Sequence, residues 1–353
     1  MKASPFGPMN SSSFLQVDRE GFFIFDQERV EDLEIGQALF KSLKVDKDGN
    51  LTVQNEKNEL KVEAFLTPIV AHFCQLNKDG SGTIESPYGN TFLFSLENLY
   101  LDEWDQFYGT TTSGIPFSLN KVAQNELFDQ LDEFDDESIT FKGSQYSTPS
   151  LFLPEHDVSC DSFWNEKYLS DVAPGWELNA PAKPLIDVLN QLKLPRCRVA
   201  VLGCGSGNDA AFFAEQGHIV TGFDFSPQAI DQAQTKYGHL ENLSFLQRDV
   251  FDLKEFYGHF DLVFEHTCFI AVDPFRRNEL VKAWHALLAE EGHLLGIFLL
   301  TPFRHHPPFT SSEWEIEKRL SKYFNNLYWT RWRTSITPRL GRELVVYSRK
   351  KNN

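Results

Sequence analysis

The sequence predicts an α/β fold for the C-terminal half of the chain and a smaller, β-rich α+β domain in front of it. From Arg198 onward, short apolar strands alternate with helical segments, which is typical of a parallel sheet flanked by helices. Before about residue 140, short strand candidates are separated by glycine-containing turns, and helical spacing is rare. A length of 353 residues also exceeds the usual size of one domain.

These patterns predict four segments along the chain. The boundary is expected where glycine, serine and proline accumulate without periodicity, at Gly143, Ser147, Pro149 and Pro154. We expect a disordered lead-in over 1–16, a β-rich α+β domain over 17–140, a linker over 141–160 and the α/β domain over 161–353.

Within the first domain, two segments have helical character and the others favour strands. Val30–Leu43 and Leu119–Phe134 carry apolar residues at helical spacing. Strands are predicted around Gly21 and at Leu51–Val53, Leu60–Val62, Ile69–Cys74 and Thr91–Phe94.

The segment Asn77–Glu85 resembles a calcium-binding loop in its acidic and glycine positions. Position 12 of such a loop would be Tyr88 rather than the required glutamate, and the flanking segments favour strands over helices. We therefore expect a hairpin turn there and no metal site.

The second domain is predicted to alternate strand and helix up to an antiparallel closing pair of strands. The predicted strands are Arg198–Leu202, Ile219–Phe223, Leu243–Gln247, Phe260–Phe264, His293–Leu300, Leu327–Ser335 and Glu343–Ser348. The predicted helices are Asp209–Gln216, Pro227–Tyr237 and Pro274–Leu288.

Charge and cysteine content exclude several classes of function. Residues 1–160 hold 11 Lys and Arg against 27 Asp and Glu, and this part carries most of the net charge of −17. Such a field repels nucleic acid and anionic membranes, so neither is expected as a partner. The chain has no apolar run long enough to span a membrane, and its five cysteines form no Cys-x-x-Cys pair, so we expect a cytoplasmic protein.

A glycine turn between an apolar strand and a helix is the strongest chemical signal. Gly203, Gly205 and Gly207 allow a ligand to approach the backbone, and Asp224 ends the next strand, where it can accept hydrogen bonds from ribose hydroxyls. These features predict an adenosine cofactor. A dinucleotide fingerprint would need glycine in place of Asn208, which favours S-adenosylmethionine over a nicotinamide cofactor.

Five patches of sequence resemble the thiopurine S-methyltransferase family, in particular its thiol and halide methyltransferase branch, over about residues 163–350. They are Phe163-Trp164-Asn165-Glu166-Lys167-Tyr168 with Trp176, Gly203–Asp209, Gly217–Ser226, Arg248–Phe251, and Phe260–Phe269 with Asp273, Pro274, Arg277 and later Pro307–Phe309. Three departures from the family pattern, at Lys167, Val250 and His306, put the choice of acceptor in doubt.

The resemblance implies a Rossmann-like, seven-stranded class I methyltransferase domain that binds S-adenosylmethionine and methylates a small soft nucleophile. The nucleophile would be a thiol, a thiopurine-like compound, thiocyanate, a halide or a chalcogen oxyanion. The cofactor-binding residues that it implies are Trp164, Trp176, Gly203, Cys204, Gly205, Gly207, Asp209, Asp224, Phe225, Asp249, Val250 and Glu265.

His266 and Thr267 follow the fourth strand and are the candidate catalytic residues. His266 has the side chain suited to accept a thiol proton near neutral pH, although an anionic acceptor needs no base. The candidate substrate pocket consists of Phe163, Phe269, His305, Pro308 and Phe309. Adjacent histidines point apart, so His305 and His306 are not expected to bind metal.

Residues 17–134 resemble the domain of unknown function 1285 family, which implies a bacterial origin and names no activity. Asp18–Phe23, Leu60–Glu63 and Glu126–Phe128 carry this resemblance. A small-molecule methyl acceptor and a protein partner for the acidic domain are the expected partners. Two other functions stay open, a non-catalytic S-adenosylmethionine sensor and a nicotinamide-dependent oxidoreductase.

Overall fold

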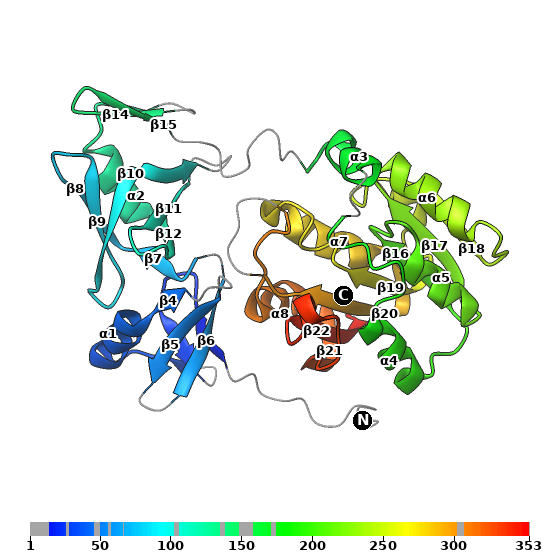
Figure 1. Cartoon of the computed structure of the whole chain (residues 1–353). Helices are drawn as coiled ribbons and strands as arrows, with labels where there is room; N and C mark the ends of the chain where they lie inside the picture. The colour runs from blue at the N-terminus through cyan, green and yellow to red at the C-terminus, as the bar shows by residue number, and fades with distance from the viewer. Residues whose placement is uncertain are drawn as a thin grey trace.

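The computed structural model describes residues 14–25, 28–45, 50–55, 58–65, 67–101, 106–134, 138–147, 158–170, 174–301 and 307–352. Figure 1 shows an N-terminal module, residues 14–147, beside a C-terminal domain that begins with helix α3, Asp161–Leu169. No helix among these residues is both long and apolar enough to cross a membrane. The predicted lead-in, residues 1–16, lies mostly outside the described part.

The N-terminal module is built from two six-stranded sheets and a small three-stranded sheet. The first sheet has the order β3-β2-β1-β6-β5-β4, with β1 Phe14–Val17, β2 Phe23–Phe25, β3 Glu28–Arg29, β4 Lys44–Val45, β5 Leu51–Asn55 and β6 Asn58–Ala64. The second has the order β7-β12-β11-β10-β9-β8, with β7 Ile69–Ala71, β8 Phe73–Leu76, β9 Ser81–Glu85, β10 Thr91–Leu101, β11 Phe107–Thr111 and β12 Pro116–Leu119.

One apolar core runs through both large sheets and the two helices of the module, α1 Leu33–Ser42 and α2 Lys121–Phe128. Tyr88 ties its parts together, since the hydroxyl donates to the Val30 carbonyl at 2.7 Å and accepts from the Phe23 amide at 3.0 Å. Its ring lies so close to Gly36 of α1 that a Cβ there would be 2.1 Å away, so only glycine fits. The calcium-like segment is a turn between antiparallel β8 and β9, as predicted.

Several boundaries differ from the predictions: the predicted strand Ile69–Cys74 is divided into β7 and β8, and the strand predicted over Leu327–Ser335 runs over Phe324–Arg331. The helix predicted over Leu119–Phe134 ends at Phe128, and its last two residues form strand β13, Glu133–Phe134. Strands β14, Ser138–Phe141, and β15, Ser144–Ser147, extend into the predicted linker and join β13 in the third sheet. Lys142 and Gly143 both have positive φ, at 50° and 76°, which is the geometry of a two-residue hairpin turn.

The C-terminal domain contains a seven-stranded sheet in the order β18-β17-β16-β19-β20-β22-β21, with only β22 antiparallel to its neighbours. This confirms the predicted Rossmann-like α/β class and the antiparallel closing pair. Its strands are β16 Arg198–Leu202, β17 Ile219–Asp224, β18 Leu243–Gln247, β19 Phe260–His266, β20 Leu288–Leu299, β21 Phe324–Arg331 and β22 Glu343–Lys350.

Helices cover both faces of this sheet, and separate cores lie on its two sides (Figure 1). Helix α6 begins directly after Ser226, whose hydroxyl accepts the Ala229 amide, and its Pro227 suits a first helical position. The helices after α3 are α4 Lys183–Leu192, α5 Asn208–Glu215, α6 Pro227–Tyr237, α7 Arg277–Leu287 and α8 Glu313–Leu320, with short 3₁₀ turns η2 Lys254–Phe256, η3 Pro274–Arg276 and η4 Thr337–Arg339.

The first turn of α8 docks against the N-terminal module. Ser312 donates its hydroxyl to the Ala64 carbonyl at 2.9 Å, and the Glu313 amide donates to Glu63 at 3.0 Å. Arg331 of β21 forms ion pairs with both Glu63 and Glu313, and its Nε lies 2.9 Å from the Glu313 carboxylate. A charged network with little solvent exposure therefore joins the two parts of the chain.

Replacing Arg331 with methionine should strongly destabilise this contact, because two carboxylates with little exposure would lose the cation between them. We expect the free energy of unfolding in urea to fall by about 3–5 kcal/mol. The matched control is Arg349→Met, which removes an exposed arginine 4.0 Å from Glu291 and should cost less than about 1 kcal/mol. Equal losses in the two variants would contradict a special role for Arg331.

Candidate active site

The glycine turn and Asp224 meet at the carboxyl edge of the sheet. The Gly205 amide donates to Asp224 Oδ2 at 2.8 Å, and the Ser226 amide donates to Oδ1 at 2.9 Å. Burial raises the pKa of Asp224, and these backbone donors favour its ionised form. The amides of Gly205, Ser226 and Phe225 all bond to this carboxylate, whose two oxygens have four lone-pair positions in total, so one position remains for a ribose hydroxyl.

Helix α3 brings aromatic side chains over the glycine turn. A Cβ on Gly205 would lie 2.9 Å from the Tyr168 hydroxyl, so the tyrosine sits directly on the turn. Trp176 donates its indole N–H to that hydroxyl at 3.0 Å, and its ring meets Trp164 edge to face with centroids 5.8 Å apart. Burial, together with the nearby Asp224 charge, raises the pKa of Tyr168, so the phenol stays neutral. Phe163 extends this aromatic row, 5.0 Å from Trp164.

His266 is held between an acidic and a basic side chain. Its Nδ1 lies 2.7 Å from Asp209 Oδ2, and its Nε2 lies 3.0 Å from Nη1 of Arg339. Because arginine can only donate, Nε2 is the accepting nitrogen and Nδ1 carries the proton that it donates to Asp209. The second Asp209 oxygen accepts the Ala182 amide at 2.7 Å. Asp209 is therefore fixed by the Ala182 amide and orients the His266 ring.

The two neighbours of His266 in the sequence are also unusual, Thr267 in its backbone conformation and Glu265 in its burial. Thr267 has φ of 65°, a left-handed conformation that is strained for a β-branched residue and is typical of functional sites. Glu265 is fully buried and accepts the Phe269 amide at 3.1 Å, while its other oxygen has no hydrogen-bond partner among the described residues. Burial raises the pKa of Glu265 to about 8.

The predicted substrate-pocket residues separate into two groups. Phe163 lies in the aromatic row, whereas the Phe269 ring is 1% exposed and packs against Phe298 in the core, so only its backbone reaches the site. Phe309 is also buried, and its amide donates to the Ile270 carbonyl at 2.8 Å, which fixes the half-buried Pro308 beside the turn after β19. His305 and His306 lie outside the described residues.

The remaining predicted cofactor residues lie along the same edge. Cys204 packs under the turn, and Cys268 packs against Gly203, where a Cβ would lie 3.1 Å from its sulfur. Burial raises the pKa of both thiols, so neither provides a thiolate. Beyond them, half-buried Phe225 follows Asp224, Gly207 begins α5, Asp249 accepts the Phe251 amide at 2.9 Å, and Val250 is buried.

These residues fit S-adenosylmethionine. Asp224 offers an oxygen for the ribose, Val250 an apolar surface for the adenine, and the α3 aromatic row a surface that attracts a sulfonium. Gly203, Gly205 and Gly207 all have positive φ, and a Cβ on any of them would lie within 3.1 Å of another side chain, so the turn requires glycine. The carboxylates of Asp209, Asp224 and Glu343 outnumber the single guanidinium of Arg339, which favours a cationic ligand.

Sequence reasoning did not include Arg339 or Tyr168 among the site residues. Arg339 ends η4, lies 73 positions from His266 and is 4% exposed, and nothing in its local sequence marks it. Tyr168 lies in the first patch that resembles the family, so a signal for it was present. Glu177, Ser206 and Asn208, which brace the glycine turn by mutual hydrogen bonds, also carried no separate signal.

The sheet order, the glycine turn with its acidic partner and the aromatic cover define an S-adenosylmethionine-dependent methyltransferase. The model of the thiopurine S-methyltransferase family matches residues 160–344, and the chain belongs to that family. It is 30% identical over 160 residues to thiocyanate methyltransferase 1 of Arabidopsis thaliana, covering 44% of this chain and 69% of that protein.

Two further relatives support the assignment. Probable thiol methyltransferase 2 of Arabidopsis thaliana is 31% identical over 181 residues, which cover 50% of this chain and 79% of that protein. The thiopurine S-methyltransferase of Shewanella baltica is 28% identical over 183 residues, which cover 46% of this chain and 83% of that protein. The family match begins after the N-terminal module, so the resemblance of that module to the domain of unknown function 1285 family stays a prediction.

Replacing Asp224 with alanine should weaken S-adenosylmethionine binding about 100-fold, because a charge-assisted hydrogen bond to the ribose would be lost. Isothermal titration calorimetry measures this directly. Asp261→Ala is the matched control, since Asp261 pairs with Arg198 at the opposite end of the sheet. An unchanged affinity in Asp224→Ala would refute the placement of the cofactor.

Replacing Glu265 with glutamine should change how stability depends on pH. The folded pKa of about 8 lies above the ordinary 4.5, so the stability that Glu265 contributes is full below pH 4.5 and declines up to about pH 8. Glutamine does not titrate. In urea unfolding, the free energy of unfolding of Glu265→Gln minus that of the wild type should therefore be more than about 1 kcal/mol larger at pH 9 than at pH 5. The same difference at both pH values would contradict a protonated Glu265.

Proposed function

We propose that this methyltransferase acts on a small, soft nucleophile that reaches the site already as an anion, such as thiocyanate, hydrosulfide, a thiolate or a halide. The observation that carries this proposal is that both ring nitrogens of His266 are engaged. Nε2 accepts from the Arg339 guanidinium, so its lone pair is not free to take a proton from the acceptor.

An anionic acceptor makes a general base unnecessary. Thiocyanate and halides carry their charge at all physiological pH values, and an ordinary thiol with a pKa of about 8.5 is partly ionised near neutrality. His266 then acts as a positioning residue, because it lies between Asp209 and Arg339 and accepts from the guanidinium, whose Nη2 also donates to the Trp176 carbonyl at 3.3 Å. The buried guanidinium, which also lies 3.6 Å from the Glu343 carboxylate, is the group that we propose attracts the acceptor.

When bound, S-adenosylmethionine supplies a methyl group activated on a sulfonium. The residues of this chain supply position and exclude water. Tyr168, together with Trp176 and Trp164, lies over the glycine turn, and the Phe309 amide is bonded to the Ile270 carbonyl in the turn after β19. Alignment of this kind accounts for most of the acceleration of a methyl transfer in line.

The names of the relatives agree with this acceptor class, since they include a thiocyanate, a probable thiol and a thiopurine methyltransferase. All five cysteines of the chain are free thiols, which supports a location in the reducing cytoplasm. We propose that the enzyme detoxifies such compounds by converting them to methylated products.

Transfer from labelled S-adenosylmethionine to a panel of acceptors tests the function. The panel contains thiocyanate, hydrosulfide, iodide, selenite, tellurite, aliphatic thiols and aromatic thiols, with cofactor binding measured alongside. Turnover of at least one soft anion is expected. Cofactor binding without any turnover would favour a sensor, and binding of a dinucleotide instead would favour an oxidoreductase.

The pH dependence distinguishes an anionic acceptor from base catalysis. For thiocyanate, kcat/KM should stay constant within about twofold from pH 6 to pH 9, because no proton is transferred. For a thiol, kcat/KM should rise tenfold per pH unit up to the pKa of that thiol. A common inflection near pH 6.5 for both acceptors would show that His266 acts as the base.

Arg339→Gln should lower kcat/KM for thiocyanate by about 100-fold, which corresponds to losing one charge-assisted contact of about 3 kcal/mol. The affinity for S-adenosylmethionine should not fall, since a cation near the sulfonium is removed. Arg342→Gln, at a neighbouring arginine that donates to the Leu300 carbonyl, is the control and should retain activity. Equal activity of Arg339→Gln and the wild type would remove Arg339 from the acceptor site.

A further inference from the structure

A cavity of about 380 Å³ lies between the N-terminal module and the C-terminal domain, away from the glycine turn. The module contributes Arg19, Phe65 and Leu119 to its walls, and the domain contributes Phe275 and Arg319. This volume lies within the range of natural small-molecule sites, which often form between domains. The methyl transfer described above makes no use of it.

Two arginines from different parts of the chain converge on one aromatic ring in this cavity. The guanidinium carbon of Arg19 lies 4.1 Å from the centroid of the Phe65 ring, and that of Arg319 lies 5.6 Å from it. Arg319 donates Nε to Glu315 and Nη2 to the Pro274 carbonyl. Among the described residues, its Nη1 and the nitrogens of Arg19 have no hydrogen-bond partner.

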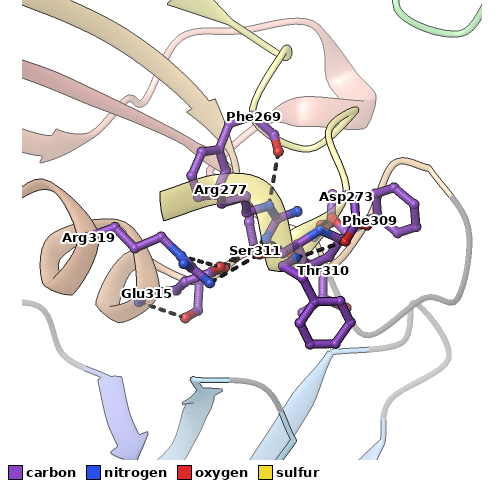
Figure 2. Close-up of polar contacts among 12 residues, drawn as sticks. Phe269, Asp273, Arg277, Phe309, Thr310, Ser311, Glu315 and Arg319 are labelled. Carbon is purple, nitrogen blue, oxygen red and sulfur yellow. Dashed lines mark hydrogen bonds and ion pairs between the residues drawn. The ribbon is translucent and has the colours of Figure 1, made fainter. Parts of the chain in front are cut away.

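The charge balance around the cavity favours an anion. Arg277 and Arg319 share the carboxylate of Glu315, and Asp273 is close enough for its charge to act on Arg277 (Figure 2). The two buried guanidiniums are therefore matched by two carboxylates, and the part of this cluster left for a ligand is Nη1 of Arg319. Among the described residues of the cavity wall the acidic one is Asp18, which is paired with Arg29 at 2.5 Å, and Glu20 pairs with the same guanidinium at 3.0 Å. Exposed Arg19 adds a positive charge at the same place.

The rest of the cavity wall includes apolar side chains that could contact an apolar part of a ligand. Val70, Leu119 and Phe275 line the cavity together with the Phe65 ring. A ligand that fills the space must therefore combine a charged group for the arginines with a flat apolar part. Because the arginines come from both parts of the chain, the ligand would bridge them.

We infer that this cavity is a second ligand site, which binds a small organic anion in which a carboxylate is carried on a flat apolar group. The carboxylate binds between Arg19 and Arg319, and the apolar part lies against Phe65 and Phe275. The site is separate from the methyl-transfer site and does not depend on its acceptor.

Calorimetric titration of the full chain with benzoate tests the inference. One equivalent of benzoate should bind with saturation, and benzamide, which has the same shape without the charge, should bind at least tenfold more weakly. Arg19→Gln, an exposed substitution, should weaken benzoate binding at least fivefold, and so should Arg319→Lys, which keeps a charge beside Glu315 but loses the planar fork. Asp224→Ala, altered in the methyl-transfer site, should bind benzoate normally.

Three outcomes would overturn the inference. They are the absence of saturable binding, equal binding of benzoate and benzamide, and benzoate binding that persists unchanged in Arg19→Gln. If Arg319→Lys fails to fold, Arg19→Gln still decides, because Arg19 makes only the ring contact with Phe65 among the described residues. Loss of benzoate binding in Asp224→Ala would assign it to the methyl-transfer site and would also overturn the inference.

Discussion

The arrangement of the C-terminal domain depends on burying one guanidinium, that of Arg277, which is 1% exposed. A charge removed from water must find its hydrogen bonds within the protein. Arg277 donates Nε to the Phe269 carbonyl at 3.0 Å and Nη1 to both the Thr310 carbonyl at 2.7 Å and Glu315 at 2.9 Å (Figure 2). Helix α7, the turn after β19, the segment before α8 and α8 itself are therefore held together at one point.

Helix α8 carries this constraint to the N-terminal module. One of its faces presents Glu315 to Arg277, while its first turn presents Glu313 to Arg331 and Glu63. The segment that contains Phe309 enters this helix, so the wall of the methyl-transfer site is fixed from two sides. The contacts of Ser312, Glu313 and Arg331 with β6 therefore join the module to the domain through the start of α8.

The sequence predicted those parts of the molecule whose causes are local. Helix α6 and strand β18 have the predicted bounds because a Ser-Pro start and an apolar strand pattern are adjacent signals, and Asp224 is found by its distance from Gly203. The pairing of His266 with Arg339 has no such signal, since it depends on how η4 packs against the end of β19. The cluster around Arg277 could not be predicted for the same reason, because its partners Thr310 and Glu315 lie 33 and 38 positions away in the sequence.

The charges of the site explain how a cationic cofactor and an anionic acceptor can share it. Asp224 and Asp209 lie near the glycine turn, while the single guanidinium of Arg339 lies beyond His266. The carboxylates favour the sulfonium, and the guanidinium, which also lies 3.6 Å from Glu343, is the positive group that the proposed anionic acceptor would approach. Transfer of the methyl group neutralises both ligands, so neither electrostatic attraction remains to retain the products. Under the proposed function, the Asp209, His266 and Arg339 chain keeps the guanidinium apart from the carboxylates of the cofactor side and transfers no proton.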